Sequence, residues 1–474
     1  MKKNVATKAA VCALLAIAAS FPCAAQAATA GGFSGVGLSL LWGVPFAGLL
    51  LSLALWPLFA ADFWHHHYGK ITAAWGVALV VPFVIAFGSG ELLHQVVHAL
   101  LLEYVPFVML LFALYTIAGG IAVRGTLFGT PTLNTSILAV GALLASIMGT
   151  TGAAMLLIRP LLRANEARQR RVHIVVFFII LVGNVGGALS PLGDPPLFIG
   201  FLKGIDFFWT TRVLALPTLV LASTLLGIFY ALDSHFWRRE NVVPPTTYTP
   251  LGVDGAFNFA LIAGVVGAVL LSGIWKPGIA FDIAGTPLEL QNLVRDVILL
   301  ALALLSLALT PKAVREANAF KWEPIAEVAQ LFAGIFLTII PVIAMLQAGR
   351  SGALAGVVDL VTDHATGQPR QLMYFWTTGL LSAFLDNAPT YLVFFNLAGG
   401  DPVELMGSLK LTLAMISAGA VYFGALTYVG NAPNFMIKAI AESRGVAMPT
   451  FFAYLGYSAV VLLPLFVVIS WIYT

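Results

Sequence analysis

Two aspartates, Asp194 and Asp386, each lie inside an otherwise apolar stretch of the chain. A carboxylate within a membrane is costly, and by default it is a candidate for binding a coupling ion. The alternative interpretation is structural, with a protonated or hydrogen-bonded acid that ties broken backbone together. No Lys or Arg lies within either motif to offset the charge. The chemistry available to each acid is therefore binding of a proton or of a hard cation such as sodium.

Both aspartates belong to motifs that recur at an offset of 237 residues (424 − 187 = 237). Residues 187–198 read Gly-Ala-Leu-Ser-Pro-Leu-Gly-Asp-Pro-Pro-Leu-Phe, and residues 424–435 read Gly-Ala-Leu-Thr-Tyr-Val-Gly-Asn-Ala-Pro-Asn-Phe. At the same offset, Gly-Thr-Thr-Gly-Ala at 149–153 aligns with Asp-Asn-Ala-Pro-Thr at 386–390. Glycine permits unusual backbone angles and proline removes a donor, so the motifs predict hairpin tips and helix breaks. The positions that would shape them are Gly149, Gly152, Gly187, Gly193, Pro195, Pro196, Pro389, Gly424, Gly430 and Pro433.

Hydroxyl and amide side chains lie in the same motifs as the two aspartates. Oxygen ligands that carry few charges suit an alkali cation better than a transition metal. Any one of them alone is more often a helix cap or a packing hydroxyl. Together with Asp194 and Asp386, which would bind sodium, the expected ion- or substrate-binding residues are Ser190, Thr427, Thr150, Thr151, Asn387, Thr390, Asn431 and Asn434.

The composition places these motifs in a membrane protein. The chain has 474 residues, of which 60% are hydrophobic and 9% are charged, and its mean hydropathy is +0.95. Soluble domains carry roughly 25% charged residues. Many apolar stretches approach the ~20 residues that a membrane-spanning helix needs. The net charge is only +3, and the Lys and Arg residues lie largely in short connections. This pattern indicates a role in orienting the protein in the membrane and not in binding nucleic acid. No phosphate-binding loop is present, so we expect neither ATP nor another cofactor.

The first 28 residues have the pattern of an export signal. Lys2, Lys3 and Lys8 precede an apolar run, and Ala25-Gln-Ala27 supplies a small-x-small cleavage pattern. The alternative is an uncleaved first helix.

If the signal is removed, the mature protein should begin near Ala28. The intact mass of purified protein checks this. Retention of residues 1–27 would show an uncleaved helix and reverse the argument for export.

Basic loops suggest the topology through the rule that Lys and Arg face the cytoplasm. A single crossing at 132–162 would separate the following basic loop from the others. If 132–162 is instead a hairpin that enters and leaves on one face, the basic loops all lie inside. Treating 371–398 as a hairpin from the other face also places Lys438 and Arg444 inside. The basic loops are Arg163 to Arg171, Arg238 to Arg239, and Lys312 to Lys321.

We therefore predict an all-α polytopic membrane protein with two inverted-topology repeats. Each repeat would contain a re-entrant hairpin and a broken helix, with about ten transmembrane helices and two hairpins in total. The expected parts are the signal at 1–28, a first repeat at 29–236, a cytoplasmic linker at 237–256 and a second, inverted repeat at 257–474.

The motifs resemble those of the ion transporter superfamily, which includes divalent anion:sodium symporters, citrate transporters and a class of sodium:proton antiporters. In its symporters, each hairpin tip is Ser-Asn-Thr and each break is of the Gly-Ser-Pro-Pro-Asn type. Here the tips are similar at 149–151 and 386–388, and the breaks at 193–197 and 430–434. Ser-Pro-Leu-Gly-Asp and Leu-Asp-Asn-Ala-Pro look more like the antiporter strings Ser-Pro-Ile-Gly-Asp and Asp-Asn-Val-Pro. The acids Asp194 and Asp386 put negative charge where a symporter would hold an anion.

The resemblance implies a secondary transporter of the bacterial inner membrane, multi-pass, with a homodimer fitting the family. We expect a sodium:proton antiporter in which Asp194 and Asp386 alternate between proton and sodium. The alternative is a cation-coupled transporter of citrate or another carboxylate, with the acids holding only the coupling ion. A membrane enzyme or scaffold would need a catalytic cluster at one membrane face, and the sequence contains none. The expected partners are sodium, protons, a carboxylate in the alternative, and the lipid bilayer.

Overall fold

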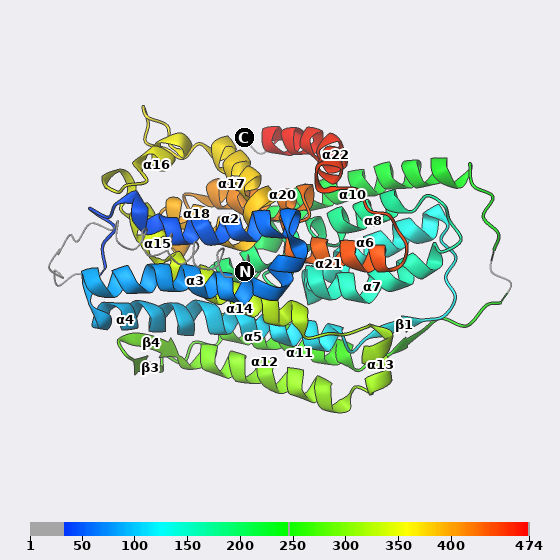
Figure 1. The fold of residues 1–474 in the computed structure, drawn as a ribbon, viewed down its shortest axis with the longest axis horizontal. Coiled ribbons are helices and arrows are strands. Elements are labelled where there is room, and N and C mark those ends of the chain that lie inside the picture. The colour runs from blue at the N-terminus through cyan, green and yellow to red at the C-terminus, as the bar shows by residue number, and fades with distance from the viewer. Residues whose placement is uncertain (1–32, 245–246, 473–474) are drawn as a thin grey trace, which may run out of the picture.

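The computed structural model describes residues 33–244 and 247–472, so the expected signal at 1–28 lies outside the described residues. Most helices run along the long axis of the molecule (Figure 1). The first half contains η1 (Leu40–Gly43), α2 (Val44–Phe59), α3 (Ala61–Phe87), α4 (Ser89–Ala99), η2 (Leu100–Tyr104), α5 (Val105–Ala118), β1 (Ala122–Arg124), α6 (Pro131–Met148), α7 (Thr150–Ala164), α8 (Val172–Leu181), η3 (Val185–Leu189), α9 (Pro195–Leu202) and α10 (Trp209–Trp237).

The second half follows a connection that includes β2 (Gly252–Asp254). It contains α11 (Asn258–Ile274), β3 (Ala280–Ile283), β4 (Thr286–Glu289), α12 (Leu290–Leu309), α13 (Lys312–Ala317), α14 (Glu323–Thr338), α15 (Ile340–Gln347), η4 (Gly349–Ser351), α16 (Ala355–Val361), α17 (Gln371–Leu385), α18 (Asn387–Leu397), α19 (Pro402–Met406), α20 (Lys410–Phe423), η5 (Gly424–Leu426), α21 (Ala432–Ser443) and α22 (Phe451–Ile472).

Length and composition make the chain a multi-pass membrane protein. Among the described residues, eight helices are long and apolar enough to cross a membrane, or nine if α14 and α15 form one span bent by 43°. We expected about ten crossings. The two apolar helices at Asn258–Ile274 and Lys410–Leu426 are shorter than a full span. Pro341 lies in the first turn of α15, where its missing N–H permits the bend.

The span Val172–Leu189, formed by α8 and η3, lies at the centre of the bundle. Inside the protein, 83% of this span is buried, against 22–50% for the other spans. Its side chains therefore meet protein on nearly all sides, whereas the outer helices leave apolar side chains exposed. Polar backbone that is broken at this depth is tolerated because neighbouring protein surrounds it.

Two helix pairs meet at a break of one residue. Gly149, with φ 81°, separates α6 from α7, and Asp386, with φ 76°, separates α17 from α18. A positive φ costs little for glycine but strains aspartate. The helices of each pair pack against each other. In Figure 1, α6 and α7 lie in the half of the molecule nearest β1, and α17 and α18 lie in the opposite half.

Two further helices are interrupted by short extended segments. The chain leaves α8 through η3 and an extended Ser190, and it re-enters helix at α9 with Asp194 as the N-cap. It leaves α20 through η5 and an extended Thr427, and it re-enters at α21 with Asn431 as the N-cap. Proline in the first turn of α9 and α21 suits a helix start, because the first N–H groups have no partner within the helix.

Each break folds back on itself so closely that it requires glycine. A Cβ atom added to Gly193 would lie 2.1 Å from the carbonyl oxygen of Gly187. The same atom on Gly430 would lie 2.7 Å from the carbonyl oxygen of Gly424. Any side chain at either position would force the backbone apart.

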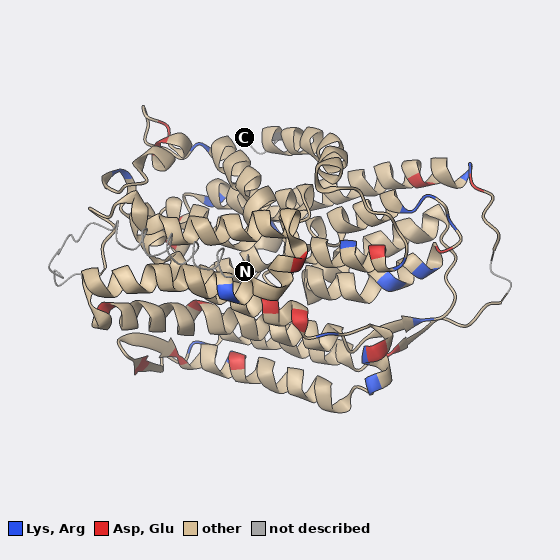
Figure 2. Cartoon of the chain, in the orientation of Figure 1, with Lys and Arg blue, Asp and Glu red and all other residues tan. Residues whose placement is uncertain are grey.

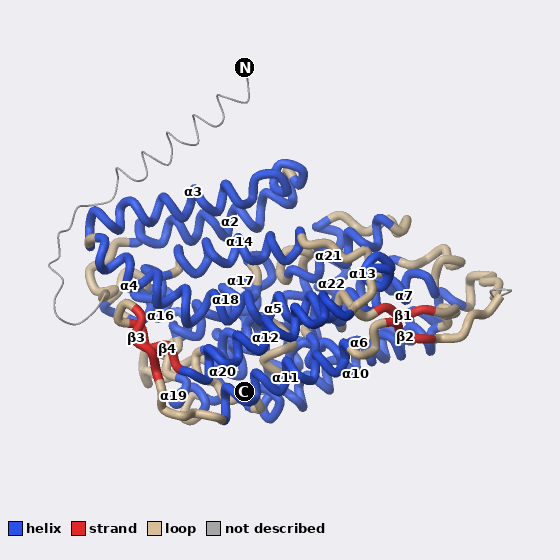
Figure 3. The backbone as a smooth tube through the Cα atoms, turned by 90° about the horizontal axis from the view of Figure 1, so that it is seen from below, coloured by secondary structure: helices blue, strands red, loops and turns tan. Residues whose placement is uncertain are grey.

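The basic loops meet at one end of the molecule, where Figure 2 shows Lys and Arg around α7, β1 and α13. The Nε atom of Arg168 lies 3.3 Å from Glu240, and Arg171 donates to the carbonyl of Gly445 at 3.1 Å. β1 and β2 pair antiparallel there, with Ala122 opposite Asp254. The second sheet, β3 with β4, lies at the opposite end (Figure 3).

We expect the end that carries the basic loops to face the cytoplasm. In a variant with Cys12 and Cys23 replaced by Ser, Gln169→Cys and Ala313→Cys should react with a membrane-impermeant maleimide only after the cells are permeabilised. Asp282→Cys in β3, at the opposite end, is the matched control and should react in intact cells. Labelling of Gln169→Cys from outside would overturn the hairpin argument for 132–162.

Candidate functional site

Asp194 is the centre of a buried polar cluster, with only 1% of its surface exposed. Its Oδ1 atom accepts hydrogen bonds from the Thr150 hydroxyl at 3.2 Å and the Asn431 amide at 2.9 Å. Its Oδ2 atom accepts from the Asn387 amide at 2.5 Å. One carboxylate thus joins both helix breaks and both single-residue tips. All three of these donors are uncharged, so they satisfy the oxygens without cancelling the charge.

A chain of amides extends the cluster across the second break. The Asn431 amide also donates to the Gly183 carbonyl at 3.1 Å and to Asn184 at 3.3 Å. Asn184 donates to the Oδ1 atom of Asn434 at 2.8 Å. Asn434 in turn donates to the carbonyls of Gly424 and Thr427, at 2.7 and 2.9 Å. The broken backbone of the first half is therefore satisfied in part by a side chain from the second half, and that of the second half by its own Asn434.

Asn387 has an acceptor that no group in the described structure satisfies. Its amide nitrogen donates to Asp194, but its Oδ1 atom is buried and has no hydrogen-bond partner. A buried acceptor left unpaired costs about 1–3 kcal/mol. Asn387 itself is fully buried at the first position of α18. The cluster thus combines a carboxylate whose charge is not neutralised with an amide oxygen that accepts no hydrogen bond. Oxygen ligands of these two kinds suit a small hard cation.

Asp386 lies at the tip between α17 and α18 but makes no hydrogen bond to the Asp194 cluster in the described structure. Its Oδ1 atom accepts from the Ala388 N–H at 3.4 Å, as the N-cap of α18. The Thr390 hydroxyl donates to the Asp386 carbonyl at 2.7 Å. Asp386 is 8% exposed, more than Asp194, and the two carboxylates repel each other electrostatically. Asp386 therefore lies beside the cluster and adds negative charge to it.

The remaining hydroxyls fasten the breaks to the tips. The Ser190 hydroxyl donates to the carbonyl of Ser146, and the Thr427 hydroxyl donates to the carbonyl of Ala383. Both pairs are related by the offset of 237 (427 − 190 = 237 and 383 − 146 = 237). These two hydroxyls are thus used by backbone groups and not by Asp194. Thr151 is half-buried in the first turn of α7.

Ser146 is a member of this arrangement that the repeat pattern does not reveal. Its hydroxyl donates to the Gly186 carbonyl at 2.5 Å and accepts from the Leu189 N–H at 3.2 Å. The residue at the matching position in the second half is Ala383, so a search for repeated polar residues passes over it. The only sequence feature that could have identified Ser146 is its position in an apolar helix, three residues before the glycine of the tip.

Long apolar helices around a buried polar cluster at broken helices define a multi-pass membrane protein with polar side chains inside its bundle. Residues 35–474 match the family model described as Putative citrate transport, and the chain belongs to this family. The family is part of the ion transporter superfamily, which confirms the resemblance drawn from the motifs. It is a family of transporters and not of enzymes. No curated protein matches the chain.

Removing the carboxylate of Asp194 should destabilise the protein. In Asp194→Ala, the Thr150 hydroxyl and the Asn387 amide lose their acceptor, whereas Asn431 keeps Gly183 and Asn184, and each unsatisfied group costs about 1–3 kcal/mol. Asp386→Ala is the matched control, because within the described structure that side chain accepts only from backbone N–H groups. Thermal unfolding of both variants in detergent should show the larger loss for Asp194→Ala. Equal losses would mean that the three hydrogen bonds do not hold the cluster together.

Proposed function

We propose that the chain is a secondary transporter of the bacterial inner membrane that carries citrate or a related carboxylate together with a coupling cation. The observation that supports this most strongly is the meeting of both tips and both breaks at Asp194, through Thr150, Asn387 and Asn431. Membership of a family described by citrate transport favours a carboxylate over sodium:proton antiport, which was our first expectation.

The proposal includes two inverted repeats, at 29–236 and 257–474, joined by a cytoplasmic linker at 237–256. The repeated contacts of Ser190 and Thr427 support it, because equivalent hydroxyls fasten equivalent tips. So does the placement of α6–α7 and α17–α18 in opposite halves of the molecule (Figure 1). Broken helices that meet in this way are the usual site of transport near the bilayer midplane.

Asp194 and the free oxygen of Asn387 would hold the coupling cation. Four helices begin at the cluster: α7 at Thr150, α9 at Pro195, α18 at Asn387 and α21 at Ala432. Their N-termini carry partial positive charge, which favours a bound carboxylate. The acids would repel that anion until a cation offsets their charge. Coupling follows, because anion and cation bind well only together.

Sodium:proton antiport remains the second candidate, and the uncharged surroundings of Asp194 favour it. Its oxygens accept only from a hydroxyl and two amides, so the acid can bind a proton or sodium but not both. Asp386 would take part in the same exchange. In this case no carboxylate is needed for ion flux.

Transport in proteoliposomes tests the proposal. An inward sodium gradient should drive accumulation of labelled citrate, and Asp194→Asn should lower the initial rate about tenfold or more, since a charged ligand of the cation is lost. Asp206→Asn, a half-exposed acid paired with Arg212, is the matched control and should transport normally.

Two outcomes would contradict cation-coupled carboxylate transport. Citrate uptake that is independent of any cation gradient removes the coupling role of Asp194. Sodium that dissipates an imposed pH gradient with no carboxylate present, and fails to do so in Asp194→Asn and Asp386→Asn, establishes antiport.

A further inference from the structure

A polar pocket, separate from the Asp194 cluster, lies at the end of the molecule that carries the basic loops. It has a volume of about 210 Å³ and lies between α7, the β1–β2 sheet and the chain that follows α13. Its charged and polar lining consists of Arg124, Arg159, Arg163, Asp254 and Asn318. Three arginines and one aspartate give the lining a net charge of +2 (3 − 1 = 2).

Arg159 is the buried member of this lining. Only 9% of it is exposed, and its Nη1 atom is buried with no hydrogen-bond partner in the described structure. The charged group that acts on it most strongly is the cation Arg444, followed by the Tyr115 phenol and the cation Arg163, and no Asp or Glu of the described residues forms an ion pair with it. A guanidinium is always protonated in proteins, and a buried charge is tolerated only when it is paired. The unpaired nitrogen therefore indicates that the pocket takes an anion.

Arg163 is held so that its guanidinium stays at the pocket wall. It lies on the same helix as Arg159, four residues further along, and its Nη2 atom donates to the Val123 carbonyl at 2.6 Å. The acid that acts on Arg163 electrostatically, Glu166, is largely exposed and is paired with Arg444 at 3.7 Å. Surface pairs of this kind contribute little, so Glu166 does not neutralise the pocket.

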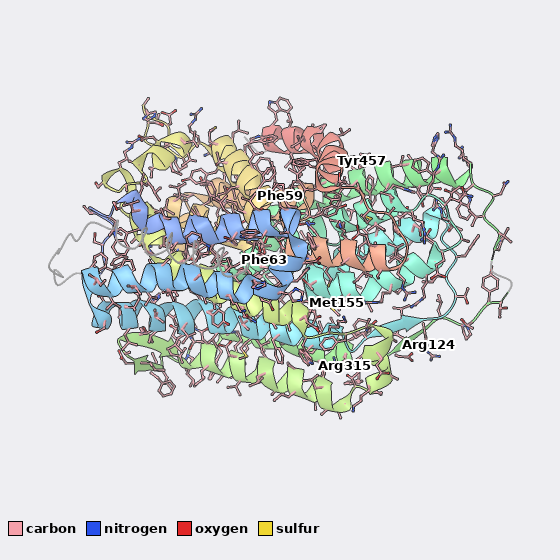
Figure 4. The ribbon with its side chains drawn as sticks, in the orientation of Figure 1. Phe59, Phe63, Arg124, Met155, Arg315 and Tyr457 are labelled. Atoms are coloured by element: carbon pink, nitrogen blue, oxygen red, sulfur yellow. The ribbon has the colours of Figure 1, made fainter. Side chains whose placement is uncertain are left out.

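Arg124 and Asp254 form the side of the pocket that faces water. Their ion pair, at 2.9 Å, has side chains that are 64% and 45% exposed. Figure 4 shows Arg124 at the end of the molecule beside β1. A mouth formed by two exposed charged side chains admits a solute from water more readily than a lipid headgroup from the bilayer. Asp254 is held by Arg124 across the sheet and leaves Arg159 free.

We propose that this pocket binds a small polycarboxylate anion through the guanidinium groups of Arg159, Arg163 and Arg124. Planar guanidinium groups pair with carboxylates in two-pronged hydrogen bonds, and a ligand with several carboxylates can engage more than one of them. The choice of a carboxylate rests on the proposed function, whereas the presence of an anion site rests on Arg159 alone.

The pocket is separate from the Asp194 cluster, although one helix connects them. Arg159 lies nine residues after Thr150 in α7 (159 − 150 = 9), which is ~14 Å along a helix axis. An anion held here contacts α7 on one side and β1, β2 and Asn318 on the other. It would therefore bind at the cytoplasmic mouth while leaving the tip at Thr150 unoccupied.

Citrate binding to purified protein in nanodiscs tests the proposal. Wild-type protein should bind citrate at a site that is independent of sodium, and Arg159→Gln should weaken this binding about tenfold or more. Arg124→Gln, at the exposed mouth, should weaken it as well and cannot unfold a buried charge network. Arg212→Gln is the matched control, because that arginine is exposed, lies in the first turn of α10 and does not line the pocket.

The outcomes separate this proposal from the proposed function. Binding that is lost in Arg159→Gln but kept in Asp194→Asn supports the pocket even if no citrate is transported. Citrate binding that is unchanged in both arginine variants overturns it. The proposal would also be overturned if phosphatidylglycerol occupied the pocket in nanodiscs of that lipid and citrate did not bind in phosphatidylcholine nanodiscs. That result would assign the arginines to a lipid headgroup.

Discussion

The carboxylate of Asp194 imposes the constraint on which the rest of the interior depends. An acid buried among apolar helices needs donors for both of its oxygens, and here a hydroxyl and two amides supply them. The donors come from three different interruptions of the helical bundle, and the acid itself lies in a fourth. All four points must therefore lie within hydrogen-bond reach. The close approach of Gly187 to Gly193, and of Gly424 to Gly430, follows from that requirement.

Satisfying the oxygens with uncharged donors leaves the negative charge in place. Asp386 adds a second acid nearby, and the free oxygen of Asn387 adds an acceptor. Only a cation or a proton can lower the free energy of such a site. In our proposal, the four helix N-termini at the same place would attract a carboxylate once a cation offsets the charge of the acids. The same geometry thus accounts for both candidate functions, which differ in whether a carboxylate joins the cation.

Much of this arrangement could be predicted from the sequence. The offset of 237 residues located both tips and both breaks, because glycine and proline interrupt helices and can be recognised directly in the sequence. Asp194, Thr150, Asn387 and Asn431 were all expected at the site, and they share one cluster. The family resemblance was also correct, although the branch it favoured is not the one that the family description names.

Other features depend on contacts that no local pattern contains. The bond from Asn184 to Asn434 joins residues 250 positions apart, and sequence spacing does not pair them. The hydroxyls of Ser190 and Thr427 were expected to bind ions, yet they donate to backbone carbonyls that only the folded chain brings near. The 43° bend between α14 and α15 lies within a continuous apolar run, and a single proline there is not enough to predict a break.

We propose that Asp194 and Asn387 bind the coupling cation. Equilibrium binding of radioactive sodium to the purified protein tests it without any transport step. Wild-type protein should bind sodium saturably, Asn387→Ala should bind it about tenfold more weakly, and Asp194→Asn should not bind it measurably. Sodium that binds to Asp194→Asn with the affinity of the wild-type protein would contradict the account.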